Sequence, residues 1–313
     1  MPDTNSPDLI SATSSTQSQK LLSTVPTDIR PGVLGAGLYL VATPIGNLRD
    51  ITLRALDILS SADLVLVEDT RRARILLSAY GIKAPLSAYH DHNVAKKLPG
   101  VIKNILAGKS VALISDAGTP LVNDPGFKLV RACIDEELPV FAIPGASAVL
   151  AGLVSSGLPP DKFMFAGFLP PKSAARQTAL RQAQDVPASL IYFETAKRIE
   201  ACLADIQAIF GDRQISIARE LTKKYEEILR GTASELLEMA RETPLRGEIV
   251  LIIAPPDAPK QWDENKIRAA LHPLIKTEGV KRAAAQIAIQ SGHKKRDVYA
   301  LALQLKESPP AKK

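Results

Sequence analysis

Two apolar runs of this chain end in clusters of small, turn-forming residues. The run Val111–Ile114 is followed by Ser115–Pro120, and the run Val140–Ile143 is followed by Pro144–Ser147. Short apolar runs bounded by Gly and Pro are typical of buried strands. Because α/β sheets bind their ligands outside the carboxyl ends of the strands, the two clusters predict a binding site in an α/β fold.

Strand-like and helix-like segments alternate from Leu38 to Ile143. Parallel strands need crossover connections long enough to hold a helix, so the alternation predicts a parallel sheet with helices on both faces. Gly81 and Gly108 follow two of the helices, where glycine readily adopts a left-handed cap conformation. We therefore predict a first α/β domain over residues 36–145. Its strands are expected at residues 38–42, 64–67, 111–114 and 140–143, and its helices at 50–60, 70–79 and 94–107.

A second set of alternating segments predicts another α/β domain over residues 146–256. Its strands are expected at residues 163–168, 190–193, 215–218 and 248–253, with helices that include 196–209 and 234–242. Pro255 and Pro256 cannot continue a strand ladder and mark the end of this domain. The last predicted region, 257–313, is small and helical. Its expected helices, 280–290 and 297–305, are joined by residues 291–296 in a pattern that resembles a helix-turn-helix.

The first 35 residues are predicted to form a disordered tail, because they are rich in Ser and Thr and lack an apolar core. They resemble neither a signal peptide nor a transit peptide. No run of 18 apolar residues occurs in the sequence, so we expect no membrane span and a cytoplasmic location. The two cysteines, Cys133 and Cys202, are expected to be small buried hydrophobic residues.

Positive charge is concentrated at the carboxyl-terminal end. The formal net charge is +6, and residues 260–313 hold 12 Lys and Arg against 5 Asp and Glu. Such an excess suits a polyanion such as nucleic acid, and it also suits a solvated helical surface. Aromatic residues make up 4% of the chain and no aromatic stripe accompanies the basic region, so phosphate contacts are favoured over a base-stacking platform.

Five polar segments follow the predicted strands in a distinctive order. They are Ala42–Ile51, Glu68–Arg71, Ser115–Pro120, Pro144–Ser147 and Ala218–Lys223. Together they resemble the tetrapyrrole-methylase-like S-adenosylmethionine (SAM) methyltransferases over residues 37–305. Within that family they resemble the branch that 2′-O-methylates a cytidine in the decoding region of 16S rRNA. The Pro-Ile-Gly-Asn-Leu and Glu-Asp-Thr-Arg segments carry this distinction, because tetrapyrrole methylases proper have a Gly-rich loop with Pro-Gly-Asp after the first strand.

The resemblance implies two α/β domains of the tetrapyrrole methylase type, with SAM in the cleft between them. It also implies a homodimer that acts on 16S rRNA in the small ribosomal subunit without a metal. Gly118 and Gly145 allow the backbone to approach the cofactor closely, and Asp116 or Ser147 can hydrogen-bond its polar groups. The residues implied to contact the cofactor are Pro44, Asp116, Gly118, Thr119, Pro120, Ala146, Ser147 and Phe165.

Methyl transfer to a hydroxyl is an in-line displacement, so an enzyme must position the groups and remove the hydroxyl proton. We expect Glu220 or Lys223 to handle the proton, and Arg71 and Arg219 to contact phosphate or to pair with carboxylates. The alternative is that Arg219 and Glu220 form only a surface ion pair with each other. The polar residues that we expect at the reaction centre are Asp69, Arg71, Arg219, Glu220 and Lys223.

Two segments depart from the family pattern. Val94 stands where the family often has Glu, and Glu194–Arg198 lacks the Ser-Pro-His that often precedes this Arg. Near the first departure, His90 and His92 have no further Cys or His cluster beside them. They are better explained as hydrogen-bonding loop residues than as metal ligands.

RNA would be oriented by basic side chains of the carboxyl-terminal region, independently of its sequence. These are Lys281, Arg282, Lys294, Lys295 and Arg296. Two other functions remain open at this point. One is methylation of a tetrapyrrole precursor, and the other is non-catalytic rRNA binding by a protein that has kept the fold.

Overall fold

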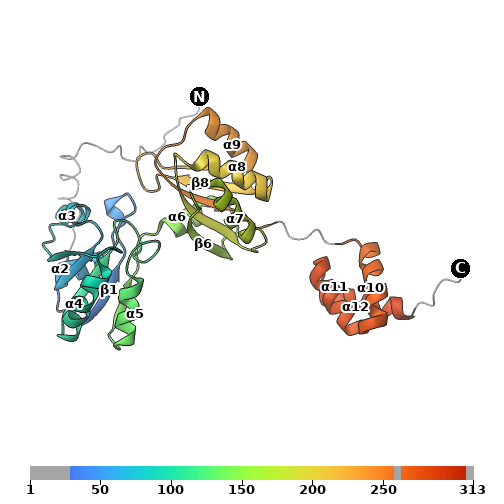
Figure 1. Ribbon diagram of the computed structural model, residues 1–313, viewed down its shortest axis with the longest axis horizontal. Helices are drawn as coiled ribbons and strands as arrows, with labels where there is room; N and C mark the ends of the chain where they lie inside the picture. Colours follow the sequence, from blue (N-terminus) through green and yellow to red (C-terminus); the bar gives the residue numbers. More distant parts are fainter. Residues whose placement is uncertain (1–28, 257–261, 308–313) are drawn as a thin grey trace, which may run out of the picture. The chain divides into compact units, whose positions relative to one another are not determined.

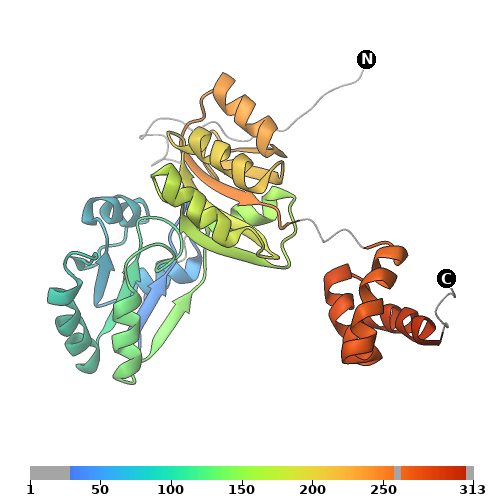
Figure 2. The same ribbon diagram turned by 45° about the vertical axis from the view of Figure 1, so that its right-hand side comes forward.

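The computed structural model describes residues 29–256 and 262–307. The predicted tail lies mostly outside these residues. The chain forms two compact units that divide after Ala254 (Figures 1 and 2). None of the described helices is long and apolar enough to cross a membrane.

The first sheet contains five parallel strands in the order β3-β2-β4-β1-β5. Its strands are β1 (Gly37–Val41), β2 (Leu64–Val67), β3 (Leu86–Ala88), β4 (Ser110–Ile114) and β5 (Val140–Ile143). Its helices are the 3₁₀ helix η1 (Leu48–Asp50), α2 (Leu53–Ser61), α3 (Thr70–Ala79), α4 (Val94–Leu106) and α5 (Phe127–Asp135). The predicted parallel sheet is confirmed. The short β3 was not predicted, because its three residues are all half-buried and show no apolar run.

Alternate residues of these strands face opposite sides of the sheet. Val65 and Val67 pack under α2 and α3, whereas Leu66 packs with Val111 under α4 and α5. Both faces are therefore covered by helices, as predicted (Figure 1).

The predicted helix 50–60 is divided into η1 and α2, because the Thr52 side chain accepts a hydrogen bond from the Ala55 amide at 3.1 Å and starts α2. Gly81 and Gly108 have the expected positive φ, at 68° and 88°.

The second sheet also contains five strands, in the order β6-β7-β10-β8-β9. Its strands are β6 (Phe163–Phe168), β7 (Ser189–Thr195), β8 (Gln214–Arg219), β9 (Glu227–Thr232) and β10 (Glu248–Ile253). β6 and β7 are parallel, and the other neighbours are antiparallel. The edge strand β9 was not predicted, because its charged and Gly residues lack an apolar pattern. This α/β architecture with a second sheet confirms the predicted fold class.

Helices cover both faces of the second sheet as well. The helices are α6 (Ala148–Ser156), α7 (Ser173–Ala183), α8 (Ile199–Phe210) and α9 (Ala233–Glu242). On one face, α7, α8 and α9 bury Tyr192 and Leu251. On the other face, α6 packs against Ile191 and Val250.

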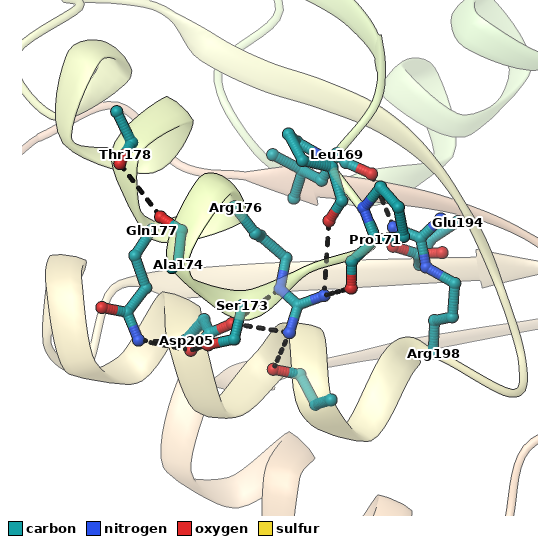
Figure 3. A network of polar contacts seen from close by, with 12 residues as sticks. Leu169, Pro171, Ser173, Ala174, Arg176, Gln177, Thr178, Glu194, Arg198 and Asp205 are labelled. Atoms are coloured by element: carbon teal, nitrogen blue, oxygen red, sulfur yellow. Dashed lines mark hydrogen bonds and ion pairs between the residues drawn. The ribbon is translucent and has the colours of Figure 1, made fainter.

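A buried polar network joins α7 to α8 and to the loop that follows β6 (Figure 3). Arg176 and Asp205 are nine-tenths buried or more, and their side chains approach to 2.6 Å. The Arg176 guanidinium also donates to the carbonyl of Pro171 at 3.2 Å, while Ser173 and Gln177 donate to Asp205 at 2.9 and 2.8 Å. Burial opposes ionisation of Asp205, but these hydrogen bonds outweigh it and hold its pKa below the ordinary value. The network fixes the start of α7.

The carboxyl-terminal unit contains three helices, α10 (Glu264–Glu278), α11 (Val280–Ser291) and α12 (Lys295–Glu307). They share a small core that includes Leu271, Ile287 and Val298. The two predicted helices are confirmed as α11 and α12. We did not predict α10, because Pro273 lies inside it and normally argues against a helix interior.

Candidate functional site

A cleft of about 340 Å³ lies between the two sheets of the first unit. Loops after β1, β4 and β5 line one side, and the ends of β7, β8 and β10 line the other. The loops of the first sheet leave the carboxyl ends of parallel strands, where α/β folds bind ligands. The lining residues are Ile45, Asp116–Thr119, Val122–Asp124, Ser147–Val149, Phe168, Phe193–Thr195, Ala218, Leu221, Lys223 and Glu248–Val250.

The loops after β1 and β4 are tied together at the floor of the cleft. Thr43 and Gly118 form an antiparallel bridge, with N···O distances of 2.9 and 3.0 Å. Gly118 has a φ of 77°, a conformation that residues with a Cβ rarely adopt. The Thr119 hydroxyl also donates to the carbonyl of Ala146 at 3.2 Å, which connects the loop after β4 to the loop after β5.

The loops after β1 and β8 meet across the two sheets. The Asn47 amide donates to Thr222 Oγ1 at 3.0 Å. Gly46 lies so close to the same loop that a Cβ on it would be 2.5 Å from Lys223 Cγ and 3.0 Å from the carbonyl oxygen of Leu221. The Pro-Ile-Gly-Asn-Leu and Glu-Leu-Thr-Lys segments are therefore in contact, although they are distant in the sequence.

We expect Gly46→Ala to lower the free energy of unfolding by about 1–3 kcal/mol, because the added methyl group overpacks the contact with Lys223 and Leu221. Urea unfolding measures this loss. Gly100→Ala is the matched control, since Gly100 lies in α4 and an added Cβ there would meet no neighbouring element within 4 Å, so that variant should be unchanged or slightly more stable. Equal stability of the two variants would contradict a tight contact at Gly46.

Three carboxyl groups gather at the first sheet's side of the cleft. Burial raises the pKa of Asp124 to about 6, and the nearby charges of Glu68 and Asp116 add to this shift, while a hydrogen bond from Ser115 opposes it. Burial and the charge of Asp116 also raise the pKa of Glu68. Arg72 offsets part of this negative charge, because its guanidinium lies 3.1 Å from Asp116.

Backbone strain is concentrated on the loops that line the cleft. Five residues other than glycine have positive φ within residues 29–256 and 262–307, and four of them lie on the loops after β4 and β8. These four are Leu121, Asn123, Glu220 and Thr222. Such conformations persist only where the surroundings hold them, and they cluster at functional sites.

Lys223 holds two carboxylates at the second sheet's side of the cleft. Its Nζ lies 2.9 Å from Glu220 and 2.8 Å from Glu248. Burial acts to lower the pKa of Lys223, but these hydrogen bonds outweigh it and keep the pKa above its ordinary value. A hydrogen bond from the Glu248 amide is the main cause that holds the pKa of Glu220 below its usual range. Lys223 is thus a stable cation and Glu220 a weak base.

Arg219 and Glu220 do not pair with each other, contrary to the alternative considered from the sequence. Arg219 Nε instead lies 2.6 Å from Glu227 of β9, because the antiparallel register places these two residues opposite each other.

Asp69 and Arg71 lie at the start of α3 and do not line the cleft. Asp69 caps the helix by accepting from the Arg71 amide at 2.7 Å, and the Arg71 side chain is 85% exposed.

Of the residues implied to contact the cofactor, four line the cleft. They are Asp116, Gly118, Thr119 and Ser147. Pro44, Pro120, Ala146 and Phe165 do not line it. The Phe165 ring packs edge-on against the Phe193 ring, with centroids 4.8 Å apart. Phe168 lines the cleft in place of Phe165. A register shift in β6 between Phe165 and Phe168 brings about this exchange.

Asp124 is one of several polar residues of the cleft that sequence reasoning missed, together with Asn123, Glu194, Thr195 and Glu248. It lies beyond the Ser115–Pro120 cluster, in a loop whose course across the cleft depends on the positive φ of Leu121 and Asn123. The signal available in the sequence was the Asn-Asp-Pro-Gly run, which is typical of a turn.

The remaining candidate residues lie outside the cleft. Within the described ranges, no group of three or more His, Cys, Asp or Glu side chains is arranged to hold a metal ion. His90 hydrogen-bonds Asn93, and Cys133 and Cys202 are buried. The predicted RNA-binding residues Lys281, Arg282, Lys294, Lys295 and Arg296 are all exposed in the carboxyl-terminal unit.

Comparison with known proteins adds to this geometry. Residues 37–237 match the family described as Tetrapyrrole (Corrin/Porphyrin) Methylases, and residues 262–306 match the RsmI C-terminal HTH domain. The chain is 47% identical over 285 residues to the ribosomal RNA small subunit methyltransferase I of Mesorhizobium japonicum, covering 90% of this chain and 96% of that protein. It is 44% identical to the protein of the same name from Haemophilus influenzae, covering 85% and 96%.

Solved structures show the same fold at low identity. Diphthine synthase superimposes with a TM-score of 0.54 and 15% identity, covering 69% of this chain and 89% of that one. A cobalt precorrin-4 methyltransferase superimposes with a TM-score of 0.51 and 16% identity, covering 69% of this chain and 94% of that one.

Proposed function

Because the chain belongs to the tetrapyrrole methylase family and, within it, to the ribosomal RNA small subunit methyltransferases I, we propose that it transfers a methyl group from SAM to ribosomal RNA. The acceptor that we propose is the 2′-oxygen of a cytidine in the decoding region of 16S rRNA. The observation that carries this function is the cleft, where loops of both sheets join apolar walls to clustered carboxylates.

The cleft residues fit SAM. Asp116 provides negative charge that suits the sulfonium or ammonium group of the cofactor, and Val122 with Phe193 provides an apolar surface that suits adenine. Ser147 and Ala148 line the cleft at the amino-terminal end of α6, where free amides suit a carboxylate. When bound, SAM supplies an electrophilic methyl group.

The residues of the chain then have to position the ribose and take up its hydroxyl proton. Asp124 suits the proton-accepting role better than Glu220 or Lys223, because its pKa of about 6 lies near working pH. Lys223 remains protonated and lines the cleft, so its ammonium suits stabilisation of the developing negative charge on the ribose oxygen. The proton of the hydroxyl thus goes to the Asp124 carboxylate, as the oxygen–carbon bond forms and the carbon–sulfur bond breaks.

The carboxyl-terminal unit favours RNA over a tetrapyrrole precursor as the substrate. It is a compact three-helix unit with exposed cations and a match to a helix-turn-helix domain, which a small-molecule methyltransferase does not require. The intact cleft favours an enzyme over a binding protein that has only kept the fold. A homodimer and a cytoplasmic location remain expectations of this proposal.

The proposal is tested by giving the purified protein labelled SAM and small ribosomal subunits that lack the modification. Ribonuclease digestion and mass spectrometry then locate the label. We expect one label on the 2′-oxygen of a decoding-region cytidine. Label on a base would show that the acceptor atom belongs to the base and not to the ribose. Unlabelled RNA, together with demonstrable SAM binding, would overturn the assignment of RNA as the substrate.

We expect a variant with Ala at all five predicted RNA-binding cations to bind small subunits at least tenfold more weakly at low salt. Each lost phosphate contact also reduces the steepness of the salt dependence of binding. The positions are Lys281, Arg282, Lys294, Lys295 and Arg296. Titrations at several salt concentrations measure both effects, and SAM affinity should be unchanged. An unaltered salt dependence would show that these cations do not contact phosphate.

A further inference from the structure

A tight turn stands at the rim of the cleft, immediately after Lys223. The Glu226 amide donates to the carbonyl of Lys223 at 3.1 Å, which closes a four-residue turn with Lys224 and Tyr225 at its tip. Lys223 itself lines the cleft. The two tip residues are therefore next to the place where substrate would enter.

The turn is held rigidly from both sides. The Thr222 amide donates to the Glu226 carboxylate at 2.5 Å, and Thr222 Oγ1 accepts from the Asn47 amide of the first sheet's loop at 3.0 Å. Glu220 and Thr222 have φ values of 50° and 64°, so the backbone before the turn is fixed in an unusual course. A rigid support lowers the entropy that binding through the tip would lose.

The tip presents an aromatic ring and a cation to solvent. Tyr225 is 65% exposed, and Lys224 Nζ lies 5.6 Å from the centre of its ring. The neighbouring carboxylates are engaged elsewhere, Glu226 with Thr222 and Glu227 with Arg219. Lys224 forms no ion pair with any residue of the described ranges.

We propose that Tyr225 stacks on a base of the RNA strand that enters the cleft, and that Lys224 contacts an adjacent phosphate. This inference rests on the proposed RNA substrate. Single-stranded RNA is commonly bound by stacking its unpaired bases on exposed aromatic side chains, with basic groups on the backbone. A solvent-exposed ring on a rigid turn beside the cleft meets the first requirement, and the ammonium of Lys224 meets the second. Sequence reasoning missed this contact because a single tyrosine is not an aromatic stripe.

The test uses the full-length protein with labelled SAM and small ribosomal subunits that lack the modification. Tyr225→Ala should raise the KM for subunits roughly 10- to 100-fold, as expected for the loss of one stacked base. Tyr225→Phe keeps the ring and should stay within about twofold of the wild type. Lys224→Ala should raise the KM by a smaller factor, and Lys103→Ala, which removes an exposed lysine from α4, should leave it unchanged. Calorimetry should show the same SAM affinity for all variants.

The outcomes separate this inference from the proposed function. If the wild type labels no RNA, the proposed function fails and the stacking role fails with it. If the wild type is active and Tyr225→Ala keeps the wild-type KM, the stacking role alone is overturned. It is equally overturned if Tyr225→Phe is as impaired as Tyr225→Ala, or if sedimentation shows that Tyr225→Ala changes the association of the chain with itself.

Discussion

Asp124→Asn is expected to lower kcat for RNA methylation by roughly 10²- to 10⁴-fold, the usual contribution of a positioned proton acceptor. Asparagine fills nearly the same space in the cleft but cannot take the hydroxyl proton. The variant should keep its affinity for small subunits. Single-turnover rates with saturating SAM measure the loss.

The pH dependence of the wild type provides a second check on Asp124. The carboxylate must be ionised to accept a proton, so kcat/KM should rise with pH through about 6 and level off above it. Burial is the main cause of the raised pKa of Asp124, the charges of Glu68 and Asp116 add to it, and a hydrogen bond from Ser115 opposes it. In Asp124→Asn this rise of kcat/KM with pH should be absent. If the variant kept the wild-type kcat and the same rise, another group would be the proton acceptor.

The stability of Asp124→Asn separates a chemical role from a structural one. The pKa of Asp124 is raised in the folded state, so the folded chain binds this proton more tightly than the unfolded chain. This tighter proton binding stabilises the folded chain fully below about pH 4, and the stabilisation is lost as the pH rises through about 6. Above pH 6 the variant should therefore be at least as stable as the wild type in urea. A marked loss of stability there would mean that the lower activity reflects damage to the fold.

Removal of Arg176 from its buried ion pair with Asp205 should lower the free energy of unfolding more than Gly46→Ala does. Arg176→Ala is expected to lower the free energy of unfolding by about 3–5 kcal/mol, because Asp205 is left buried with an uncompensated charge. The carbonyl of Pro171 would also lose its donor (Figure 3). Denaturant unfolding measures the difference.

Arg131→Ala is the matched control for Arg176→Ala. Arg131 pairs with Asp135 at 2.9 Å, but both side chains are more than half exposed, so we expect a loss below about 1 kcal/mol. Replacing Arg176 with Met and Asp205 with Leu together should recover much of the stability, since the pair would be replaced by apolar groups. Equal losses in Arg176→Ala and Arg131→Ala would contradict a desolvated pair.

Local sequence patterns were sufficient to predict most of the α/β fold. Val111–Ile114 and Val140–Ile143 are uninterrupted apolar runs, and both became parallel strands of the first sheet. β3 and β9 were missed because edge strands bury less and need fewer apolar residues. The helix α10 was missed because tertiary packing of Leu271 and Ile267 outweighs the local effect of Pro273.

The candidate site was harder to predict, because its parts are brought together by loops. Lys223 and Asp116 stand in recognisable motifs and line the cleft. The position of Asp124 depends instead on left-handed backbone conformations at Leu121 and Asn123, which the residue types alone do not specify. The exchange of Phe165 for Phe168 likewise depends on an irregular pairing of β6, for which the sequence carries no clear signal.

The distance in sequence between the two walls of the cleft has a consequence for synthesis. All five strands of the first sheet have been made once the ribosome passes Ile143, and domains generally fold in the order in which they are made. The contact from Asn47 to Thr222 and the wall at Glu248–Val250 must wait for the second sheet. A nascent chain therefore acquires a folded amino-terminal half well before it has a place for a ligand, and it becomes competent to bind only after Glu248–Val250 have been made.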